Sequence, residues 1–249
     1  MDDIRPRCGW CNLSNPVYVA YHDAEWAVPS HDDHHLFEMP VLETFQAGLS
    51  WETILNKRKR FRQAFDGFDI ERIRRYDENK IAELMNDPGI IRNRRKIVAT
   101  VGNANAFRDI QTSYGSFDDY IWRFTGRHVI YETGMTTSPL SDAIAVDLKT
   151  YGMRFIGTTI VYAYLQSIGV INAHEPGCFL HRGKVTRARI YKVARAESLR
   201  EEPVLLVILL IEFLVALFDP GKDSGRLFTL LRGERFEQFA ESQPTFTTG

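Results

Sequence analysis

Two short segments, one at each end of the first 183 residues, carry side chains that can bind a metal ion. Cys8 and His22 have thirteen residues between them, and His174 and Cys178 lie four positions apart. Thiolate and imidazole suit zinc, which takes four such ligands in a tetrahedron. If all four side chains bind one ion, that ion joins the start of a domain to its end. Such an ion would mark residues 1–183 as one domain.

The third cysteine, Cys11, follows Cys8 in a Cys-Gly-Trp-Cys sequence. This spacing also occurs in thioredoxin-like redox motifs, which need a strand before the pair and a helix after it. The surrounding sequence predicts neither element, so a metal site is favoured over redox chemistry. Three cysteines are too few for a disulfide framework. The sequence begins Met-Asp-Asp without the pattern of a signal peptide, and a reducing cytoplasm is the expected compartment.

The composition is that of an ordinary soluble globular protein, with 44% hydrophobic and 25% charged residues. The net charge of −1 gives no overall attraction to nucleic acid or membrane. Basic residues are nevertheless gathered in two runs, which are either solvated helix faces or a phosphate-binding surface. The runs are Lys57, Arg58, Lys59, Arg60 and Arg62, and then Arg92, Arg94, Arg95 and Lys96.

The hydrophobic pattern predicts an all-α fold, because no sustained alternation of polar and apolar residues indicates strands. Pro40 lies inside the first predicted helix and is expected to kink it, since proline has no backbone N–H. The predicted helices begin near Asp32 or Asp33, Ser50, Asp77, Asn93, Ser116 and Ser141.

A glycine-containing turn at residues 153–159 is followed by a predicted helix over residues 160–167. Thr158 or Thr159 can cap that helix, and Gly169 can end it. A helix N-terminus has unpaired N–H groups that favour an anion such as a DNA phosphate. Several DNA-repair proteins use this helix, hairpin and helix layout, although the segment alone also fits a plain helical hairpin.

Aromatic residues are concentrated in the first 51 residues, where three of the four tryptophans occur. Such rings either form a core or stack on a base and attract a cation. Glu43 lies within an apolar helical pattern nearby. Burying an unpaired carboxylate is costly, so Glu43 either has a structural partner or faces a ligand.

The segment after residue 183 has a different character. Basic residues precede the apolar run Val204–Phe218, which contains Glu212. A membrane span needs roughly 20 residues, so this run favours a buried or partner-covered helix, and no membrane association is expected. Residues 184–249 are predicted to form a C-terminal extension of unknown role.

Eight short motifs, taken in order, resemble the DNA-3-methyladenine glycosylase I family over about residues 5–183. They include Arg7-Cys8-Gly9-Trp10, Tyr21-His22-Asp23, Gln46-Ala47-Gly48-Leu49-Ser50-Trp51, Gly89-Ile90-Ile91-Arg92, Phe155-Ile156-Gly157-Thr158-Thr159 and His174-x-x-x-Cys178. The resemblance implies a helix-hairpin-helix glycosylase fold, with a zinc snap that joins the two ends of the domain. The implied zinc ligands are Cys8, His22, His174 and Cys178. It also implies a monomer that excises 3-methyladenine from alkylated double-stranded DNA and releases the free base.

The resemblance further assigns roles to single residues. Glu43 corresponds to the base-recognising, catalytic glutamate, and Tyr21 and Trp51 to the stacking rings. The other residues expected near the base are Trp10, Tyr18 and Gln46. Those expected to contact DNA are Leu49, Gly157, Thr158 and Thr159.

Four features depart from the family pattern. Cys11 is an additional thiol beside a predicted zinc ligand, Pro40 precedes Glu43, and Ala173 stands where the family usually has Asp. Residues 184–249 exceed the usual family length. Two alternatives to a glycosylase remain open: a zinc-stabilised DNA-binding module without catalysis, and a metal-stabilised helical scaffold that binds a protein.

Overall fold

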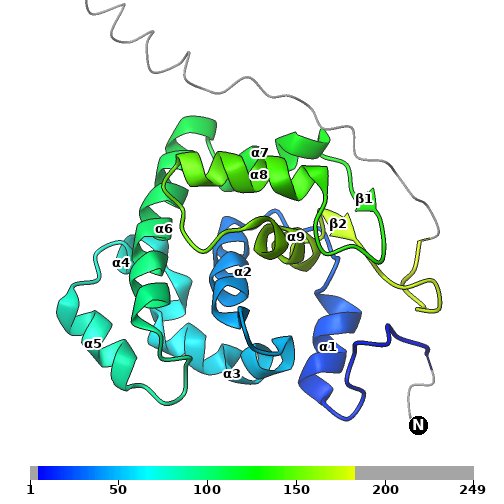
Figure 1. The fold of residues 1–249 in the computed structure, drawn as a ribbon, viewed down its shortest axis with the longest axis horizontal. Helices are drawn as coiled ribbons and strands as arrows, with labels where there is room; N and C mark the ends of the chain where they lie inside the picture. Colours follow the sequence, from blue (N-terminus) through cyan, green and yellow to red (C-terminus); the bar gives the residue numbers. More distant parts are fainter. Residues whose placement is uncertain (1–4, 183–249) are drawn as a thin grey trace, which may run out of the picture. The chain divides into compact units, whose positions relative to one another are not determined.

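The computed structural model describes residues 5–182, which form a mainly helical fold (Figure 1). Helices of residues 5–182 are α1 (Pro16–Ala24), α2 (Asp33–Gln46), α3 (Trp51–Ala64), α4 (Ile70–Ile73), α5 (Glu78–Asn86), α6 (Arg94–Tyr114), α7 (Phe117–Trp122), α8 (Pro139–Thr150) and α9 (Thr158–Ser167). Two 3-10 turns, Asp66–Phe68 and Arg123–Thr125, and the strands β1 (Ile130–Tyr131) and β2 (Ile171–Asn172) complete it.

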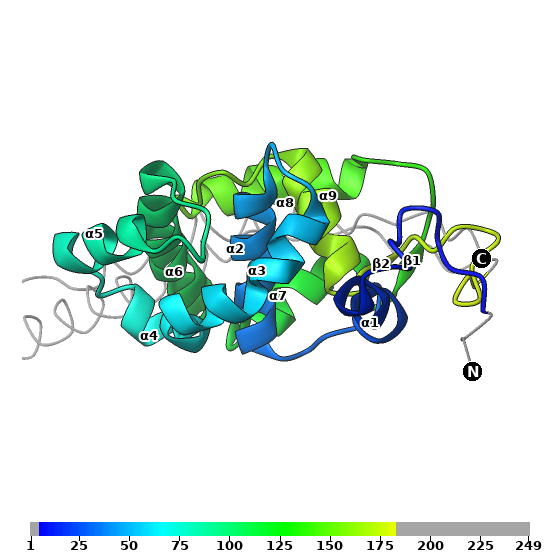
Figure 2. The ribbon, with the colours of Figure 1, turned by 90° about the horizontal axis from the view of Figure 1, so that it is seen from below.

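Helix α2 lies in the middle of this fold, between α6 and α9 (Figures 1 and 2). It packs against α3, α6, α7 and α9, and every residue from Leu36 to Phe45 is buried. A helix buried around its whole circumference places each of its polar side chains against a partner or a cavity. Glu38 and Glu43 are the two carboxylates in this buried stretch. Their surroundings therefore show which of them is structural.

Helix α2 continues through Pro40 as one helix. The proline was expected to disturb it, because residue 40 cannot donate to the carbonyl of Leu36. That carbonyl instead accepts a hydrogen bond from the hydroxyl of Tyr164, on α9. The neighbouring helix therefore supplies the donor that the proline lacks.

Most helix starts follow from local capping chemistry. The side chains of Asp32, Ser50, Asp77, Asn93 and Ser116 each accept a hydrogen bond from a backbone N–H in the first turn of α2, α3, α5, α6 and α7. Because these caps are local, the sequence predicted them correctly.

The start of α8 was predicted too late. The helix begins at Pro139 with Ser138 as its cap, and Ser141 lies in the third position, where it completes a capping box. Ser141 is therefore the partner of the cap and not the cap itself.

The helices α1 and α4 and the two strands were not predicted at all. Helix α1 has clear signals in retrospect, because Asn15 caps it and Pro16 occupies its first position. Strands β1 and β2 pair in parallel, with Ile130 opposite Ile171 and Tyr131 opposite Asn172. Strands of two residues are too short to produce a sequence alternation.

The connection between α8 and α9 differs from its prediction in one respect. Gly157 precedes α9 without a side-chain cap, so neither Thr158 nor Thr159 caps the helix. The Thr158 hydroxyl instead lies 2.8 Å from the hydroxyl of Ser141, on α8. Gly169 follows the end of α9 with a φ of +74°, and an added Cβ there would collide with the backbone of Val28.

Within residues 5–182, no helix has the length and apolar character that a membrane span requires. The apolar run Val204–Phe218, and the whole of the predicted extension over residues 184–249, lie outside the described residues.

Candidate functional site

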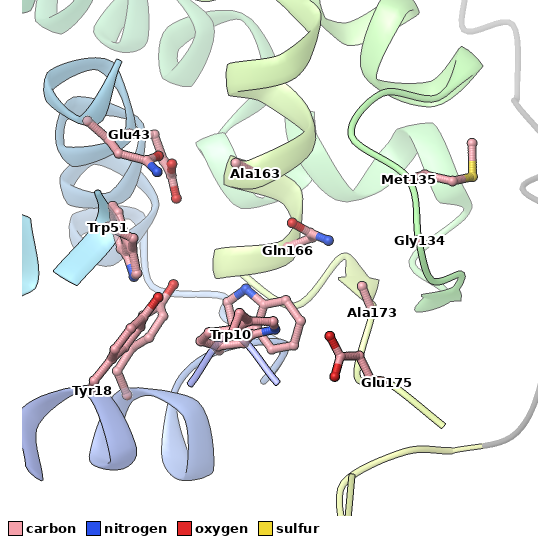
Figure 3. A pocket seen from close by; sticks show the side chains of 13 residues that line it. Trp10, Tyr18, Glu43, Trp51, Gly134, Met135, Ala163, Gln166, Ala173 and Glu175 are labelled. Carbon is pink, nitrogen blue, oxygen red and sulfur yellow. The ribbon is translucent and has the colours of Figure 1, made fainter. Parts of the chain in front are cut away.

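A cavity of about 290 Å³ opens where α1, α2, the start of α3 and α9 meet (Figure 3). Six residues predicted from the sequence line it together: Trp10, Tyr18, Tyr21, Glu43, Gln46 and Trp51. The further lining residues are Trp26, Gly134, Met135, Ala163, Gln166, Ala173 and Glu175. Segments from both halves of the described chain therefore build one pocket.

Five aromatic side chains form much of the pocket wall. The rings of Tyr21 and Trp51 contact each other, with centroids 5.5 Å apart and planes tilted by 52°. No base fits between two rings at that separation, so this pair forms one wall. Trp10 packs against Tyr18 at 5.4 Å and against Trp26 at 4.7 Å. The two groups of rings give a ligand flat apolar surfaces to stack upon.

Glu43 brings a carboxylate into this aromatic pocket. Its side chain is 3% exposed, and its Oε2 atom has no hydrogen-bond partner among residues 5–182. Figure 3 shows the carboxylate directed from α2 toward α9. Burial raises the pKa of Glu43 to about 8. The indole Nε1 of Trp51 is likewise buried without an acceptor among the described residues.

Glu38, five residues earlier on α2, is the contrasting case. Its Oε1 accepts hydrogen bonds from Arg58 at 2.8 Å and from Arg62 at 2.7 Å. Arg58 also pairs with Glu25 at 2.6 Å. Both carboxylates belong to the same buried helix, but within residues 5–182 only Glu38 has charged hydrogen-bond partners. Glu38 is therefore structural, and Glu43 is the carboxylate available to a ligand.

Beside the pocket, the four predicted metal ligands come together. Cys8, His22, His174 and Cys178 are all buried, and their ligand atoms lie within 4.8 Å of one another. The Sγ atom of Cys8 lies 3.4 Å from Nδ1 of His174. The Sγ atom of Cys178 lies 3.5 Å from Nε2 of His22 and 3.5 Å from Nδ1 of His174. Two thiols and two imidazoles in this arrangement can hold a metal ion.

A second layer of polar contacts orients one of the imidazoles. Oδ1 of Asp23 lies 2.7 Å from Nδ1 of His22, so Nε2 of that ring faces the cluster. Arg7 holds the Asp23 carboxylate through Nη2 at 2.6 Å and lowers its pKa. A carboxylate on the far nitrogen is the usual support of a metal-bound histidine. This contact makes the donor set suitable for a cation.

The sulfur atoms receive backbone hydrogen bonds. The N–H of Glu175 donates to Sγ of Cys8 at 3.4 Å, and the N–H of Leu180 donates to Sγ of Cys178 at 3.4 Å. Burial raises the pKa of the Cys8 thiol to about 12. Burial, and then the neighbouring His22, lower the pKa of His174 to about 4. A bound cation would favour the thiolate over the thiol, because it compensates the burial of that charge.

Cys11 is buried as well but is not one of the four clustered ligands. Its backbone N–H donates to the carbonyl of Cys8 at 3.0 Å, so the chain turns between the two residues. Burial raises the pKa of the Cys11 thiol. No strand lies before this pair among the described residues, and the thioredoxin-like alternative has no structural support.

The metal cluster and the pocket share a wall. The ring of Trp26 meets His174 edge to face, with centroids 4.7 Å apart, and Trp10 packs against His22 at 5.2 Å. Glu175, which follows His174, accepts a 2.6 Å hydrogen bond from the N–H of Gly9. The cluster therefore fixes the loop that carries Trp10 against the pocket.

The residues predicted to contact DNA lie outside the cavity wall. Leu49 is 42% exposed in the turn between α2 and α3. Gly157, Thr158 and Thr159 form the start of α9. The hydroxyl of Thr44, beside Glu43, donates to the carbonyl of Phe155 at 3.4 Å. The connection before α9 is therefore in contact with the helix that carries Glu43.

The first basic run is mostly structural. Arg58 and Arg62 bind Glu38, Arg60 pairs with Asp87 at 2.8 Å, and Lys57 donates to the carbonyl of Pro88 at 3.1 Å. Lys59, Arg60 and Arg62 are nevertheless exposed, so a phosphate-binding role for this part of the run stays a prediction.

In the second run, Lys96 is buried and donates to the carbonyls of Phe45 and Ala47 at 3.2 and 3.1 Å. Arg94 pairs with Glu78 at 2.6 Å. Arg92 and Arg95 remain exposed, so they are the members of this run that stay available to a phosphate.

Sequence reasoning missed several lining residues, Gln166 and Glu175 among them. Gln166 lies three positions after Ala163 on α9, so both face the pocket from one side of that helix. The one sequence signal is Ala163, a small residue where a cavity needs room. That signal can be used only once α9 is known to line the pocket.

Comparison with known proteins is consistent across sequence and structure. A sequence model described as methyladenine glycosylase matches residues 10–181. DNA-3-methyladenine glycosylase 1 of Escherichia coli (strain K12) is 41% identical over 183 residues, which cover 71% of this chain and 97% of that protein. A crystal structure of 3-methyladenine DNA glycosylase I has a TM-score of 0.68 and 42% identity, and covers 71% of this chain and 100% of that chain. A variant of such an enzyme in complex with 3-methyladenine has a TM-score of 0.66 and 31% identity, with coverages of 70% and 98%.

Proposed function

Because the chain belongs to the methyladenine glycosylase family, we propose that it hydrolyses the N-glycosidic bond of 3-methyladenine in alkylated double-stranded DNA. The observation that carries this proposal is the buried carboxylate of Glu43, whose Oε2 has no hydrogen-bond partner among residues 5–182, in a cavity lined by five aromatic rings. A solved relative binds 3-methyladenine, which supports the same ligand here. We further propose that the protein acts as a monomer in the cytoplasm and releases the free base.

The chemistry of the lesion fits these residue types. Methylation at N3 leaves the adenine of the nucleotide cationic and makes it a good leaving group. The protein must extrude the nucleotide, which costs a few kcal/mol, and then hold the cationic base. Aromatic faces attract a desolvated cation by about 2 kcal/mol or more. Glu43 acts first as the acceptor that recognises the base and second as a base toward water.

Zinc is the metal that best suits the Cys8, His22, His174 and Cys178 cluster. A tetrahedral site with Zn–S near 2.3 Å and Zn–N of about 2.0–2.1 Å places sulfur and nitrogen roughly 3.5 Å apart. The distances from Cys8 Sγ to His174 Nδ1 and from Cys178 Sγ to both imidazoles are 3.4 to 3.5 Å, and all four ligand atoms lie within 4.8 Å of one another. A closed set of four protein ligands leaves no open position, which favours a structural zinc that joins the two ends of the domain.

The pocket supports a monofunctional glycosylase. A lyase that works through a Schiff base needs an amine to attack the sugar carbon. No lysine lines the cavity described here, and the amine of Lys96 is bound to two backbone carbonyls. Borohydride should therefore trap no covalent adduct with methylated DNA. A trapped covalent adduct would refute the monofunctional assignment.

The two alternatives differ from this proposal in what they require of Glu43. A DNA-binding module without catalysis needs no buried carboxylate in a pocket, and a helical scaffold would pair it, as Glu38 is paired. The exposed side chains of Arg92 and Arg95 suit either kind of DNA-binding protein. The unpartnered Glu43 favours the glycosylase.

Release of free base from methylated duplex DNA tests the proposal. The wild type should release 3-methyladenine, and Glu43→Gln should reduce that rate strongly while it keeps its fold. Trp51→Ala should weaken binding of free 3-methyladenine by about 1–3 kcal/mol through lost stacking. Glu83→Gln on α5 is the control, because the Glu83 side chain is 67% exposed and away from the cavity wall. Failure of the wild type to release any base would reject the proposed function.

A further inference from the structure

The connection between α8 and α9 contains a phenylalanine in a backbone conformation that suits glycine. Phe155 has a φ of +56°, and its side chain is 44% exposed. A bulky residue at positive φ is strained, and such strain persists only where the surroundings hold it. The pocket and the caps of α9 do not require this ring to be exposed. The question is therefore what holds Phe155 and what its ring contacts.

Asn103 on α6 holds the residue before it from both sides. Its Nδ2 donates to the carbonyl of Arg154 at 3.1 Å, and its Oδ1 accepts from the N–H of Arg154 at 2.8 Å. Asn103 is 7% exposed, so these hydrogen bonds are shielded from water. One side chain thus satisfies both backbone groups of Arg154, in the way a neighbouring strand would.

Two further contacts fix the backbone after Arg154. The carbonyl of Phe155 accepts the hydrogen bond from Thr44, and Ile156 is buried with 2% exposure. These contacts hold the backbone on both sides of Phe155, and the residue is 44% exposed. Thr44 follows Glu43 on α2, so the backbone of Phe155 contacts the helix that carries Glu43 to the pocket.

We propose that Phe155 is an apolar contact to duplex DNA beside the extruded nucleotide, and that Asn103 is the positioning residue that holds it there. The proposal rests on the proposed function, since it takes duplex DNA as the substrate. Apolar side chains that press into a base step stabilise kinked DNA, and a rigid one does so without an ordering cost.

The neighbouring surface fits this role. Leu49, an exposed apolar residue of the α2–α3 turn, follows Thr44 by five positions along the chain. Figure 2 shows this turn and the α8–α9 connection along the same side of the fold, at the top of the view. The exposed Arg154 adjoins Phe155 and can meet a phosphate. An apolar ring between cationic and apolar neighbours suits a nucleic-acid groove.

Binding to a duplex with a central tetrahydrofuran abasic site, followed by fluorescence anisotropy, tests the contact. Phe155→Ala should bind this duplex about tenfold more weakly, the factor expected for one lost aromatic contact. Phe155→Leu should recover part of the loss. Free 3-methyladenine, followed by tryptophan fluorescence, should bind all three proteins equally. Wild-type duplex affinity in Phe155→Ala would overturn the proposal.

Asn103→Asp tests the positioning role, because it keeps the acceptor for the N–H of Arg154 and loses the donor to its carbonyl. It should weaken duplex binding, and combination with Phe155→Ala should give no further loss, since both changes remove one contact. Additive losses would show that Asn103 does not act through Phe155. Binding of free 3-methyladenine should stay unchanged in each variant.

Phe155→Gly tests the DNA contact of Phe155 without any change at Asn103, so it can be used even if Asn103→Asp does not fold. Glycine accepts positive φ, so this variant should be at least as stable as the wild type to heat and still bind the duplex about tenfold more weakly. A variant that is stable and binds normally would overturn the contact. If the wild type releases no base, the proposed function is rejected. The duplex affinities can still be measured in that case, so the two failures are distinguishable.

Discussion

The hydroxyl of Tyr164 on α9 donates a hydrogen bond of 2.9 Å to the backbone carbonyl of Leu36 on α2. In an uninterrupted α-helix the N–H of residue 40 would bind that carbonyl, and Pro40 has none. Burial raises the pKa of Tyr164 well above its usual value, so the hydroxyl keeps its proton and donates. Through this contact α2 continues to Glu43 despite the proline.

Removal of that donor should destabilise the protein. Tyr164→Phe leaves the Leu36 carbonyl buried and unpaired, and we expect the free energy of unfolding to fall by about 1–3 kcal/mol. Pro40→Ala restores an N–H for the same carbonyl. In the Pro40→Ala background, Tyr164→Phe should therefore cost clearly less, which urea unfolding of the four proteins measures as a double-mutant cycle. Equal losses in both backgrounds would contradict the compensation.

This contact also shows what the sequence could and could not predict. Pro40 and the helix around it are visible locally, but the compensating Tyr164 lies 128 residues after Leu36. Caps such as Asp32 and Ser50 were predicted because donor and acceptor lie within one turn. Partners from distant helices have no such local signal.

The two carboxylates of α2 also show that partners from distant helices cannot be predicted from the local sequence. Glu38 and Glu43 both occur within one apolar run, and the local pattern does not distinguish them. Only the packing of α3 shows that Arg58 and Arg62 reach Glu38 and that Glu43 faces the cavity. The role given to Glu43 came from the family resemblance, and its physical basis came from the structure.

Metal analysis should separate the two neighbouring cysteines. Cys178→Ala removes one of the four clustered ligands, so zinc content should fall well below one per chain. Structural zinc in small peptides contributes on the order of 10–16 kcal/mol, and this variant should also melt at a lower temperature. Cys11→Ala is the matched control and should keep its metal. Equal metal loss in the two variants would show that Cys11 is a ligand as well.

The predicted extension over residues 184–249 should be dispensable for chemistry. The four clustered side chains and every residue that lines the cavity precede residue 183. A chain that ends at Gly183 should therefore keep its metal content and release 3-methyladenine at the rate of the full chain. Metal analysis and the base-release assay on purified protein check both. An insoluble or metal-free product would show that the extension completes the core.

Glu43 should make stability fall as the pH rises. In the empty pocket its pKa is about 8, against an ordinary value of 4.5. Between these two values the unfolded chain has lost the proton and the folded protein has kept it. Unfolding then releases a proton, so this group favours folding most below pH 4.5 and loses that contribution as the pH approaches 8.

Glu43→Gln removes this titration and isolates its effect. The variant and the wild type should be similarly stable near pH 4, and the variant should be the more stable by several kcal/mol at pH 8. Thermal or urea unfolding of both proteins across that range gives the difference, in which the other titrating groups cancel. A stability difference that does not change with pH would show that Glu43 titrates normally in the folded protein.

The same ionisation should govern excision. A cationic base is held better by the carboxylate than by the carboxylic acid, so kcat/KM of the wild type should rise with pH, with its midpoint near pH 8. The bound cation lowers the pKa of Glu43, because an opposite charge favours the ionised form, and kcat should level off at a lower pH. Glu43→Gln should be slow, without either rise. Wild-type rates in this variant, or identical pH profiles, would remove Glu43 from the catalytic residues.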